Sequence, residues 1–225
     1  MCGRYTLTQT GQLPAVFEIS EVRIPPRFNI APTQEVPVVR LSEERGRYLD
    51  SLKWGLVPGW AKDPSIGARM INARSETVDK KPSFRDAFRQ RRCLVPADGF
   101  YEWKKLPRAK QPYFIGMGDR SVFAFAGLWE CFERADQELE TFTILTCEPN
   151  TLLSNIHDRM PVILPRETYS AWLDPKTDPT DLSSLLIPYP AVNMTSFPVS
   201  KLVNSPRNDT PHCIEPVDPP SSLFS

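Results

Sequence analysis

The chain has only two histidines among its 225 residues, and its five cysteines include no Cys-x-x-Cys pair. Because these two residue types are the usual zinc ligands, we expect neither a metal centre nor a cofactor. The odd number and irregular spacing of the cysteines argue against a disulfide framework. A reducing, cytoplasmic environment is therefore expected.

The sequence also lacks a net charge and a long apolar run. Lys plus Arg and Asp plus Glu number 27 each, so any surface that binds nucleic acid must be a local patch. No apolar run approaches the length of a membrane span, and the start of the chain has neither the basic nor the apolar region of a signal peptide. We expect no association with membranes.

Proline is abundant, with 24 residues, which favours short strands, many loops and few long helices. Strand-like segments follow one another, with helical patterns interspersed irregularly. This order predicts an α+β fold of one domain, with a largely antiparallel, barrel-like β-sheet core and short flanking helices. The expected domain covers residues 1–217, and the Pro/Ser-rich end, 218–225, is expected to be disordered.

The expected strands show alternating or clustered apolar residues between turn signals. They are residues 35–41, 48–54, 92–96, 99–105, 112–117, 121–131, 141–147, 161–164 and 194–199. The expected helices are residues 13–17, 82–90, 166–173 and 181–186, with a short helix or turn at 150–157. The proline-flanked stretch 27–32 is unsuited to a central strand and is expected to be an ordered loop that crosses the fold.

Cys2 carries the most unusual chemistry of the sequence. Since cysteine is small, removal of Met1 is favourable, and the mature chain would begin with a free α-amine beside a thiol. The ordinary pKa is ~7.7–8.0 for an α-amine and ~8.5 for a thiol, so each group supplies some of its nucleophilic form at neutral pH. An aldehyde that condenses with the amine gives an imine, and the thiol can close on the same carbon as a five-membered thiazolidine. The alternative is a loose terminus whose cysteine packs as a small hydrophobe.

Two other segments each have a structural and a nucleic-acid interpretation. The loop 54–60 carries Trp54 and Trp60, whose indoles either stack on bases or belong to the core at a strand end. The densest basic cluster either follows a phosphate backbone or is a solvated helix face. Its members are Lys80, Lys81, Arg85, Arg89, Arg91 and Arg92.

Seven segments, together and in this order, closely resemble the SRAP (SOS response-associated peptidase) family over nearly the whole chain to about Val217. They are Met1-Cys2-Gly3-Arg4, Arg27-Phe28-Asn29-Ile30-Ala31-Pro32, Trp54-Gly55-Leu56-Val57-Pro58-Gly59-Trp60, Ile71-Asn72-Ala73-Arg74-Ser75-Glu76, Gly99-Phe100-Tyr101-Glu102-Trp103, Ile156-His157-Asp158-Arg159-Met160-Pro161 and Cys213-Ile214-Glu215-Pro216-Val217. The resemblance implies a protein that caps abasic sites in single-stranded DNA through a covalent crosslink to Cys2. An abasic sugar is partly an open-chain aldehyde, the electrophile that an amine and a thiol on one residue require.

The resemblance also implies the catalytic roles. Glu102 is the general acid and base for the sugar ring oxygen and the imine, with a pKa raised by partial burial. His157 contacts the opened sugar and assists proton transfer, and Asn72 orients the nitrogen of Cys2 or the lesion. Taken alone, these three residues would be a surface glutamate, a capping histidine and a turn residue. We also expect weak lyase activity and slow self-reversal of the crosslink.

A further set is assigned to DNA, because guanidinium groups suit phosphates and aromatic rings suit base stacking. The expected DNA-binding residues are Arg4, Arg74, Arg159, Asn29, Trp54, Trp60 and Trp103. Trp60 is expected in the loop that blocks continued duplex at a junction with single-stranded DNA. We expect a monomer whose binding is sensitive to salt and has little sequence preference.

Three other functions have to be weighed. The N-terminal-nucleophile glutamine amidotransferases also begin Met-Cys-Gly, but they rely on an Asn-Gly oxyanion element, and this sequence has no Asn-Gly dipeptide. A thiol peptidase using Cys2 and His157 would remove Met1 from its own chain. A non-covalent module for single-stranded DNA would not need the Cys2 thiol at all.

Overall fold

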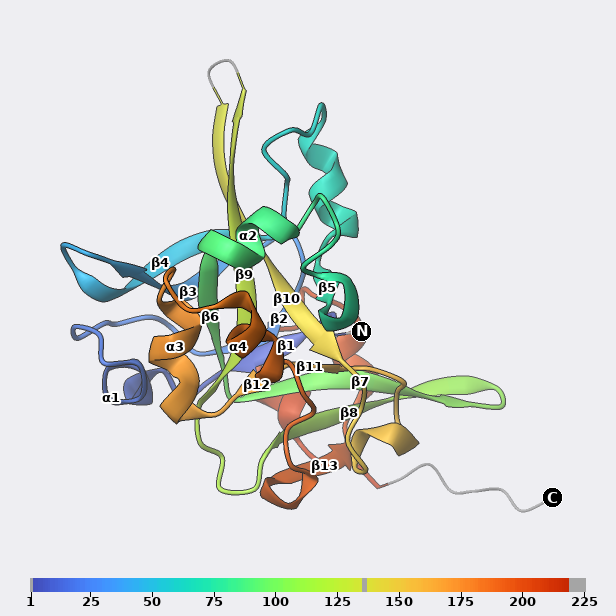
Figure 1. The fold of residues 1–225 in the computed structure, drawn as a ribbon. Helices are drawn as coiled ribbons and strands as arrows, with labels where there is room; N and C mark the ends of the chain where they lie inside the picture. Colours follow the sequence, from blue (N-terminus) through green and yellow to red (C-terminus); the bar gives the residue numbers. More distant parts are fainter. Residues whose placement is uncertain (1, 135–136, 219–225) are drawn as a thin grey trace.

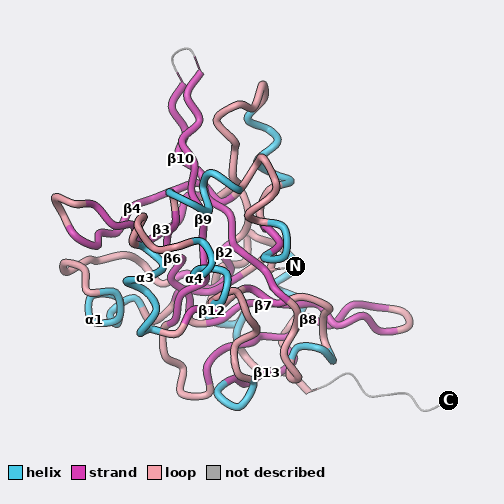
Figure 2. Tube along the Cα trace, in the orientation of Figure 1, coloured by secondary structure: helices cyan, strands magenta, loops and turns pink. Residues whose placement is uncertain are grey.

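The computed structural model describes residues 2–134 and 137–218. Its strands form a five-stranded sheet and an eight-stranded sheet. The helices are short and lie mostly at the periphery of the strands (Figure 2). Within the described residues, no helix has the length and apolar character needed to cross a membrane. The end predicted to be disordered lies outside the described residues, apart from Asp218.

The five-stranded sheet is antiparallel and has the order β13-β8-β7-β1-β2. Its strands are β1 (Tyr5–Leu7), β2 (Arg27–Ile30), β7 (Gly99–Leu106), β8 (Ala109–Met117) and β13 (Met194–Pro198). Tyr5 in β1 lies opposite Phe100 on one side and Ile30 on the other. The short N-terminal strand is therefore held between two neighbours, which fixes the position of the residues before it.

The eight-stranded sheet contains a closed barrel. Strands β10, β4, β3, β6 and β9 pair in that order, and β9 pairs with β10 again. The barrel strands are β3 (Glu35–Ser42), β4 (Gly46–Trp54), β6 (Arg92–Ala97), β9 (Phe123–Arg134) and β10 (Gln137–Cys147), and the short additions are β5 (Asn72–Arg74), β11 (Met160–Pro161) and β12 (Ile163–Leu164). The β4–β10 and β5–β10 pairs are parallel and the others antiparallel. The predicted α+β fold with a largely antiparallel, barrel-like core is confirmed.

Strands β9 and β10 continue beyond the barrel as a long arm, and the β7–β8 hairpin projects on another side (Figure 1). The two sheets share an aromatic core. Tyr5 of β1 makes edge contacts with Trp54 at 5.3 Å and Phe125 at 5.8 Å between ring centroids, and Trp54 stacks on Phe142. These rings are fully buried, and each buried apolar side chain of this size contributes about 1.5–3 kcal/mol. The strand that follows Cys2 is thus anchored to the barrel.

The helices are close to their predicted positions. They are α1 (Leu13–Phe17), α2 (Arg85–Gln90), α3 (Tyr169–Leu173) and α4 (Pro179–Ser184), with 3-10 helices η1 (Thr10–Gln12), η2 (Pro64–Arg69), η3 (Ser75–Thr77), η4 (Leu153–Asn155), η5 (Arg166–Thr168), η6 (Ala191–Asn193), η7 (Lys201–Asn204) and η8 (Pro211–Ile214). The predicted start of α4 at 181 is wrong by two residues. Pro179 occupies its first turn, and the Asp178 side chain accepts the N–H of Thr180 as an N-cap.

The predicted loop at 27–32 is wrong for its first four residues, which form strand β2. The prolines flank this strand without interrupting it, and β2 is an edge strand that needs one neighbour only. In place of a second neighbouring strand, the Asp209 carboxylate accepts hydrogen bonds from the backbone N–H groups of Phe28 and Asn29 in β2, at 2.5 and 2.9 Å. A side chain therefore satisfies the donors that another strand would have used.

Gly55 begins the segment that carries Trp60, and a side chain there should be costly. Its φ is +131°, and a Cβ would lie 2.6 Å from the carbonyl oxygen of Gly67. Gly46 also has a positive φ, +68°, but nothing lies within 4 Å of its Cβ position. We expect Gly46→Ala to lower the free energy of unfolding by about 1 kcal/mol and Gly55→Ala by at least ~2 kcal/mol more, as measured by urea denaturation. If both variants lose the same free energy of unfolding, the close approach of Gly55 to the Gly67 carbonyl oxygen does not affect stability.

Candidate functional site

The four residues predicted to be catalytic meet where the two sheets adjoin. Cys2 precedes β1, and Glu102 lies in the neighbouring strand β7. Asn72 begins β5 and His157 lies just before β11; these two strands pair with the last residues of β10. Residues that are far apart in the chain are thereby brought together, as the contacts of Cys2 with Asn72 and Glu102 and of Glu102 with His157 show.

Cys2 is fully buried. Its carbonyl oxygen accepts a hydrogen bond from Nδ2 of Asn72 at 3.0 Å, and its thiol donates to the carbonyl oxygen of Arg4 at 3.8 Å. Burial raises the pKa of the Cys2 thiol well above its ordinary value, and the negative charge of Glu102 acts in the same direction. The thiol is therefore neutral at physiological pH, and a base must take its proton when it reacts.

Asn72 has a spare acceptor beside Cys2. Its Nδ2 group also donates to the carbonyl oxygen of Ile71 at 2.6 Å, so both donor hydrogens are used. Its Oδ1 atom is buried and has no hydrogen-bond partner among the described residues. An unsatisfied buried acceptor is costly, which makes this oxygen suited to an N–H or O–H group that enters the site.

Glu102 is a buried carboxyl, with 2% of its surface exposed. Burial raises its pKa from 4.5 to about 7, and the charge of Asp158 adds to this effect. The rise agrees with the value expected for a carboxyl that transfers protons, since acid and carboxylate forms coexist near neutral pH. Its neighbours Tyr101 and Trp103 belong to a separate apolar cluster, as strand alternation predicts.

His157 presents one ring nitrogen to Glu102, with Nε2 and Oε2 3.8 Å apart. Its Nδ1 atom accepts the backbone N–H of Arg159 at 3.1 Å and also lies 2.8 Å from Oδ1 of Asp158. Because the backbone donor is fixed and Asp158 is exposed, we assign the proton of the neutral ring to Nε2. Burial lowers the pKa of His157, which favours this neutral ring.

Arg4 and Asn29 hold the chain around the site. The Arg4 guanidinium donates to the carbonyl oxygen of Val203 at 2.7 Å and to Oδ1 of Asn29 at 3.3 Å. Asn29 is fully buried, and its amide donates to the carbonyl oxygens of Val203, Ser205 and Asn208. This burial favours a structural role, and contact of Asn29 with DNA stays a prediction.

The three tryptophans differ in exposure. Trp54 is fully buried and donates its indole N–H to the carbonyl oxygen of Ile71 at 2.9 Å. This favours the core interpretation, and its contact with DNA stays a prediction. Trp60 is 61% exposed. Trp103 is half-buried and donates to Oδ1 of Asn204 at 2.8 Å. The stacking role of Trp60 and Trp103 stays a prediction.

Three members of the basic cluster at 80–92 have partners within the protein, whereas Lys80, Lys81 and Arg89 are exposed. Arg92 is buried and donates to carbonyl oxygens at the ends of α2 and α3, which are those of Phe88, Arg89, Trp172 and Asp174. Arg91 pairs with Glu130 at 2.7 Å, and Arg85 pairs with Asp86 at 3.3 Å. These contacts favour a structural role for Arg91 and Arg92, and the phosphate-tracking interpretation of the exposed members stays a prediction. Arg74 is exposed, whereas Arg159 forms an ion pair with Glu76.

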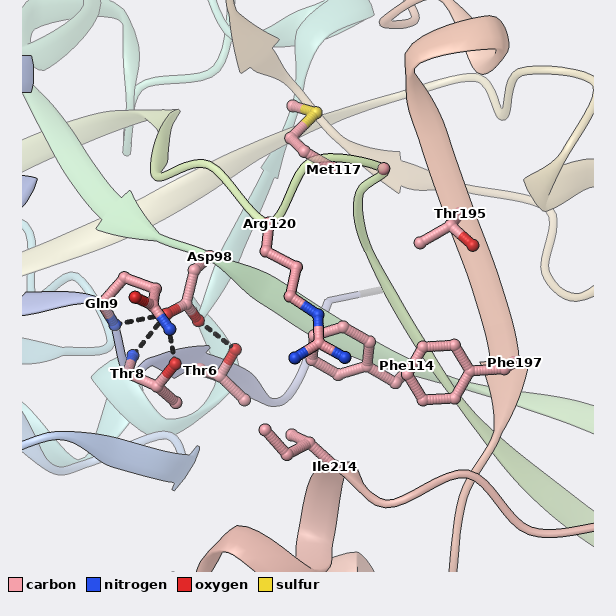
Figure 3. A pocket seen from close by; sticks show the side chains of 11 residues that line it. Thr6, Thr8, Gln9, Asp98, Phe114, Met117, Arg120, Thr195, Phe197 and Ile214 are labelled. Atoms are coloured by element: carbon pink, nitrogen blue, oxygen red, sulfur yellow. Dashed lines mark hydrogen bonds between the residues drawn. The ribbon is translucent and has the colours of Figure 1, made fainter.

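A cavity of about 250 Å³ lies away from the predicted catalytic residues, none of which lines it (Figure 3). Asp98 in its wall accepts hydrogen bonds from the hydroxyls of Thr6 and Thr8 and from the N–H groups of Thr8 and Gln9. The carboxylate therefore ties the end of β1 to the turn before β7. Its role is to fix the strand that follows Cys2.

One group of side chains has the composition of a metal site. Cys131, Glu133 and Glu138 on the β9–β10 arm bring one possible ligand atom each within 4.8 Å of the others. Both glutamates are exposed, as in many acidic surface groups that bind no ion. The group lies outside the catalytic constellation.

Comparison with known proteins gives one family. A family model described as SOS response associated peptidase (SRAP) matches residues 1–206. The chain is 47% identical over 223 residues to the abasic site processing protein YoqW of Bacillus subtilis, covering 96% of this chain and 99% of that protein. It is 35% identical over 232 residues to the abasic site processing protein HMCES of Gallus gallus, covering 89% and 69%.

The fold has a solved counterpart. The crystal structure of a protein from Bacteroides thetaiotaomicron is 26% identical in sequence and superposes with a TM-score of 0.87. The match covers 96% of this chain and 100% of that chain. The arrangement of the two sheets is therefore shared over essentially the whole length.

The buried carboxyl of Glu102 should make stability depend on pH. Between pH 4.5 and about 7 the unfolded chain has lost this proton while the folded chain keeps it, so the free energy of unfolding falls as pH rises. The full effect is about 3 kcal/mol. We expect Glu102→Gln to remove it and to be more stable than the wild type above pH 7, as measured by urea unfolding. The exposed control Glu44→Gln should show the same pH dependence of the free energy of unfolding as the wild type. If Glu102→Gln also shows the wild-type pH dependence, the raised pKa of Glu102 is contradicted.

Proposed function

The chain belongs to the SRAP family, and we propose that it processes abasic sites in DNA by bonding covalently to them through Cys2. The names of the relatives support the substrate. The observation that carries the chemistry is the position of Cys2, which is buried and close enough to the Glu102 carboxyl for its charge to raise the pKa of the thiol. An aminothiol beside a proton-transferring carboxyl suits a reaction with an aldehyde.

The proposal requires cleavage of the bond between Met1 and Cys2, since an acylated nitrogen does not condense with an aldehyde. Glu102 in its acid form donates a proton to the ring oxygen of the abasic sugar, the bond from that oxygen to the anomeric carbon breaks, and the anomeric hydroxyl loses its proton to water. The sugar is then an open-chain aldehyde and Glu102 a carboxylate. The Cys2 amine adds to the aldehyde carbon, and loss of one water molecule leaves an imine. The buried acceptor of Asn72 is placed to orient the amine or the sugar hydroxyl.

The thiol then closes the ring. Its sulfur bonds to the former aldehyde carbon, and its proton passes to the imine nitrogen, giving a thiazolidine. Glu102 as carboxylate and His157, whose Nε2 lies 3.8 Å from it, form the relay for this transfer. Overall, one water molecule leaves when the aminothiol and the aldehyde combine, and no oxidant or metal takes part.

The same groups account for two minor reactions. Protonation of the thiazolidine sulfur reopens the imine, and hydrolysis of the imine releases Cys2. From the imine, loss of a proton from the sugar carbon next to it expels the 3′ phosphate, which is a lyase reaction. Both reactions depend on proton transfer by Glu102 and are slow while the ring is closed.

We propose that the protein prefers single-stranded DNA because its nucleophile is buried. The lesion must leave the base stack to reach Cys2, and this costs least where no partner strand is paired. Arg74 and Trp60 are exposed, and we propose that they contact the strand and that Trp60 blocks the duplex at a junction. One chain supplies all the reacting groups, so a monomer suffices.

The alternative function is a thiol peptidase that removes Met1. A peptidase nucleophile reacts as a thiolate, whereas burial raises the pKa of the Cys2 thiol and opposes that form. Intact masses of the wild type and of Cys2→Ala distinguish the two routes. Loss of Met1 from both proteins indicates a separate aminopeptidase, and loss from the wild type alone indicates self-cleavage.

The thiol and the amine of Cys2 have separable roles in the crosslink. Wild-type protein incubated with abasic single-stranded DNA should give a band that survives denaturation, and Cys2→Ala and Cys2→Ser should not, because neither closes a thiazolidine. Cys2→Ser keeps the amine, so borohydride should trap its imine as a stable product. A strand whose abasic aldehyde has been reduced beforehand is the control. A full-strength band from Cys2→Ala without borohydride contradicts the proposal.

Glu102 should control the rate of crosslinking and its pH dependence. We expect Glu102→Gln to be about 100- to 10,000-fold slower at saturating DNA, the usual contribution of a general acid. The wild-type rate should decline above pH about 7, where the acid form is lost, and this limb should be absent in the variant. Rapid-quench kinetics across this pH range measures both effects. A Glu102→Gln variant with the wild-type rate and pH profile excludes the role.

A further inference from the structure

Arg159 lies two residues after His157, and its guanidinium is already occupied. Nη1 and Nη2 make a bidentate ion pair with the two carboxylate oxygens of Glu76, the second at 3.0 Å. Nη2 also donates to the carbonyl oxygen of Thr146 at 2.5 Å. The outer edge of the guanidinium is therefore filled by a carboxylate, which has the geometry in which arginine binds a phosphate.

The pair crosses strand β10. Glu76 lies in η3, directly after β5, and Arg159 directly precedes β11; both strands pair with the end of β10. The Arg159 side chain is 13% exposed and that of Glu76 is 45% exposed, so the carboxylate forms the solvent side of the pair. The hydrogen bond with Arg159 lowers the pKa of Glu76, which keeps it ionised at neutral pH.

We propose that Glu76 occupies the phosphate-binding edge of Arg159 in the free protein and that a DNA phosphodiester replaces it on binding. This inference rests on the proposed function, since it takes Arg159 as a contact to the strand beside the lesion. In the free protein the pair is neutral and attracts DNA little. When a strand binds, its phosphate replaces the Glu76 carboxylate on the same edge of the Arg159 guanidinium. Only a phosphate that lies at this position therefore forms the ion pair with Arg159. Glu76 thus weakens binding to DNA that does not fill this position.

Glu76→Gln tests the exchange, because it removes the charge and keeps the size. Binding of a fluorescent oligothymidylate without an abasic site should strengthen roughly three- to tenfold in anisotropy titrations. The log–log slope of affinity against salt should steepen by about 0.7, the value for one further phosphate on a single strand. Glu44→Gln, which makes the same change of net charge in the β3–β4 turn, should change neither quantity.

The double variant Glu76→Gln/Arg159→Gln tests whether the stronger DNA binding of Glu76→Gln requires Arg159. If it does, the double variant should bind DNA no better than Arg159→Gln alone. Thermal melts establish that each variant is folded. Unchanged or weaker binding by folded Glu76→Gln, or an equal gain in Glu44→Gln, overturns the exchange and makes Glu76 a structural partner only. A wild-type protein that neither binds the intact strand nor crosslinks the abasic one overturns the proposed function itself, a separate result.

Discussion

The hydrogen bonds and packing that fix the first few residues determine what this protein can do. β1 is three residues long, yet it lies between β7 and β2, and Tyr5 packs into the barrel core. Asp98 holds the end of this strand, and Asn72 holds the carbonyl of Cys2 before it. A terminus that would otherwise be loose is thereby buried beside a carboxyl. Both sheets serve to keep this reactive residue in place.

Burial sets the protonation states around Cys2. It raises the pKa values of the thiol and of Glu102 and lowers that of His157, so at neutral pH the thiol and the imidazole are neutral and Glu102 is divided between its acid and carboxylate forms. Such groups can exchange protons through an aldehyde addition without building up unpaired charge. Of the nearby arginines, Arg4 donates to a backbone carbonyl and Arg159 forms an ion pair with Glu76. On the exchange that we propose, a strand must replace Glu76 before Arg159 binds a phosphate.

The sequence predicted the fold class and most strands, because alternation and turn residues are local signals. It failed for β2, where flanking prolines hid a short edge strand, and it gave no signal for β5, whose pairing with β10 depends on the distant chain. Family motifs pointed to the candidate catalytic residues, which the fold brings together, but a motif does not report burial. Trp54 and Asn29 match the motifs and are nevertheless buried in the core. The ion pair of Arg159 with Glu76 is likewise invisible until the fold brings η3 and β11 together.

Mass spectrometry of the product tests the central claim most directly. The purified protein should be treated with an abasic single strand, digested, and the modified peptide sequenced. The account predicts one adduct, on an N-terminal Cys2 that lacks Met1, with the mass of peptide plus sugar fragment less one water and with no free thiol at that residue. An active protein that retains Met1, or an adduct on a lysine or an internal cysteine, would contradict it.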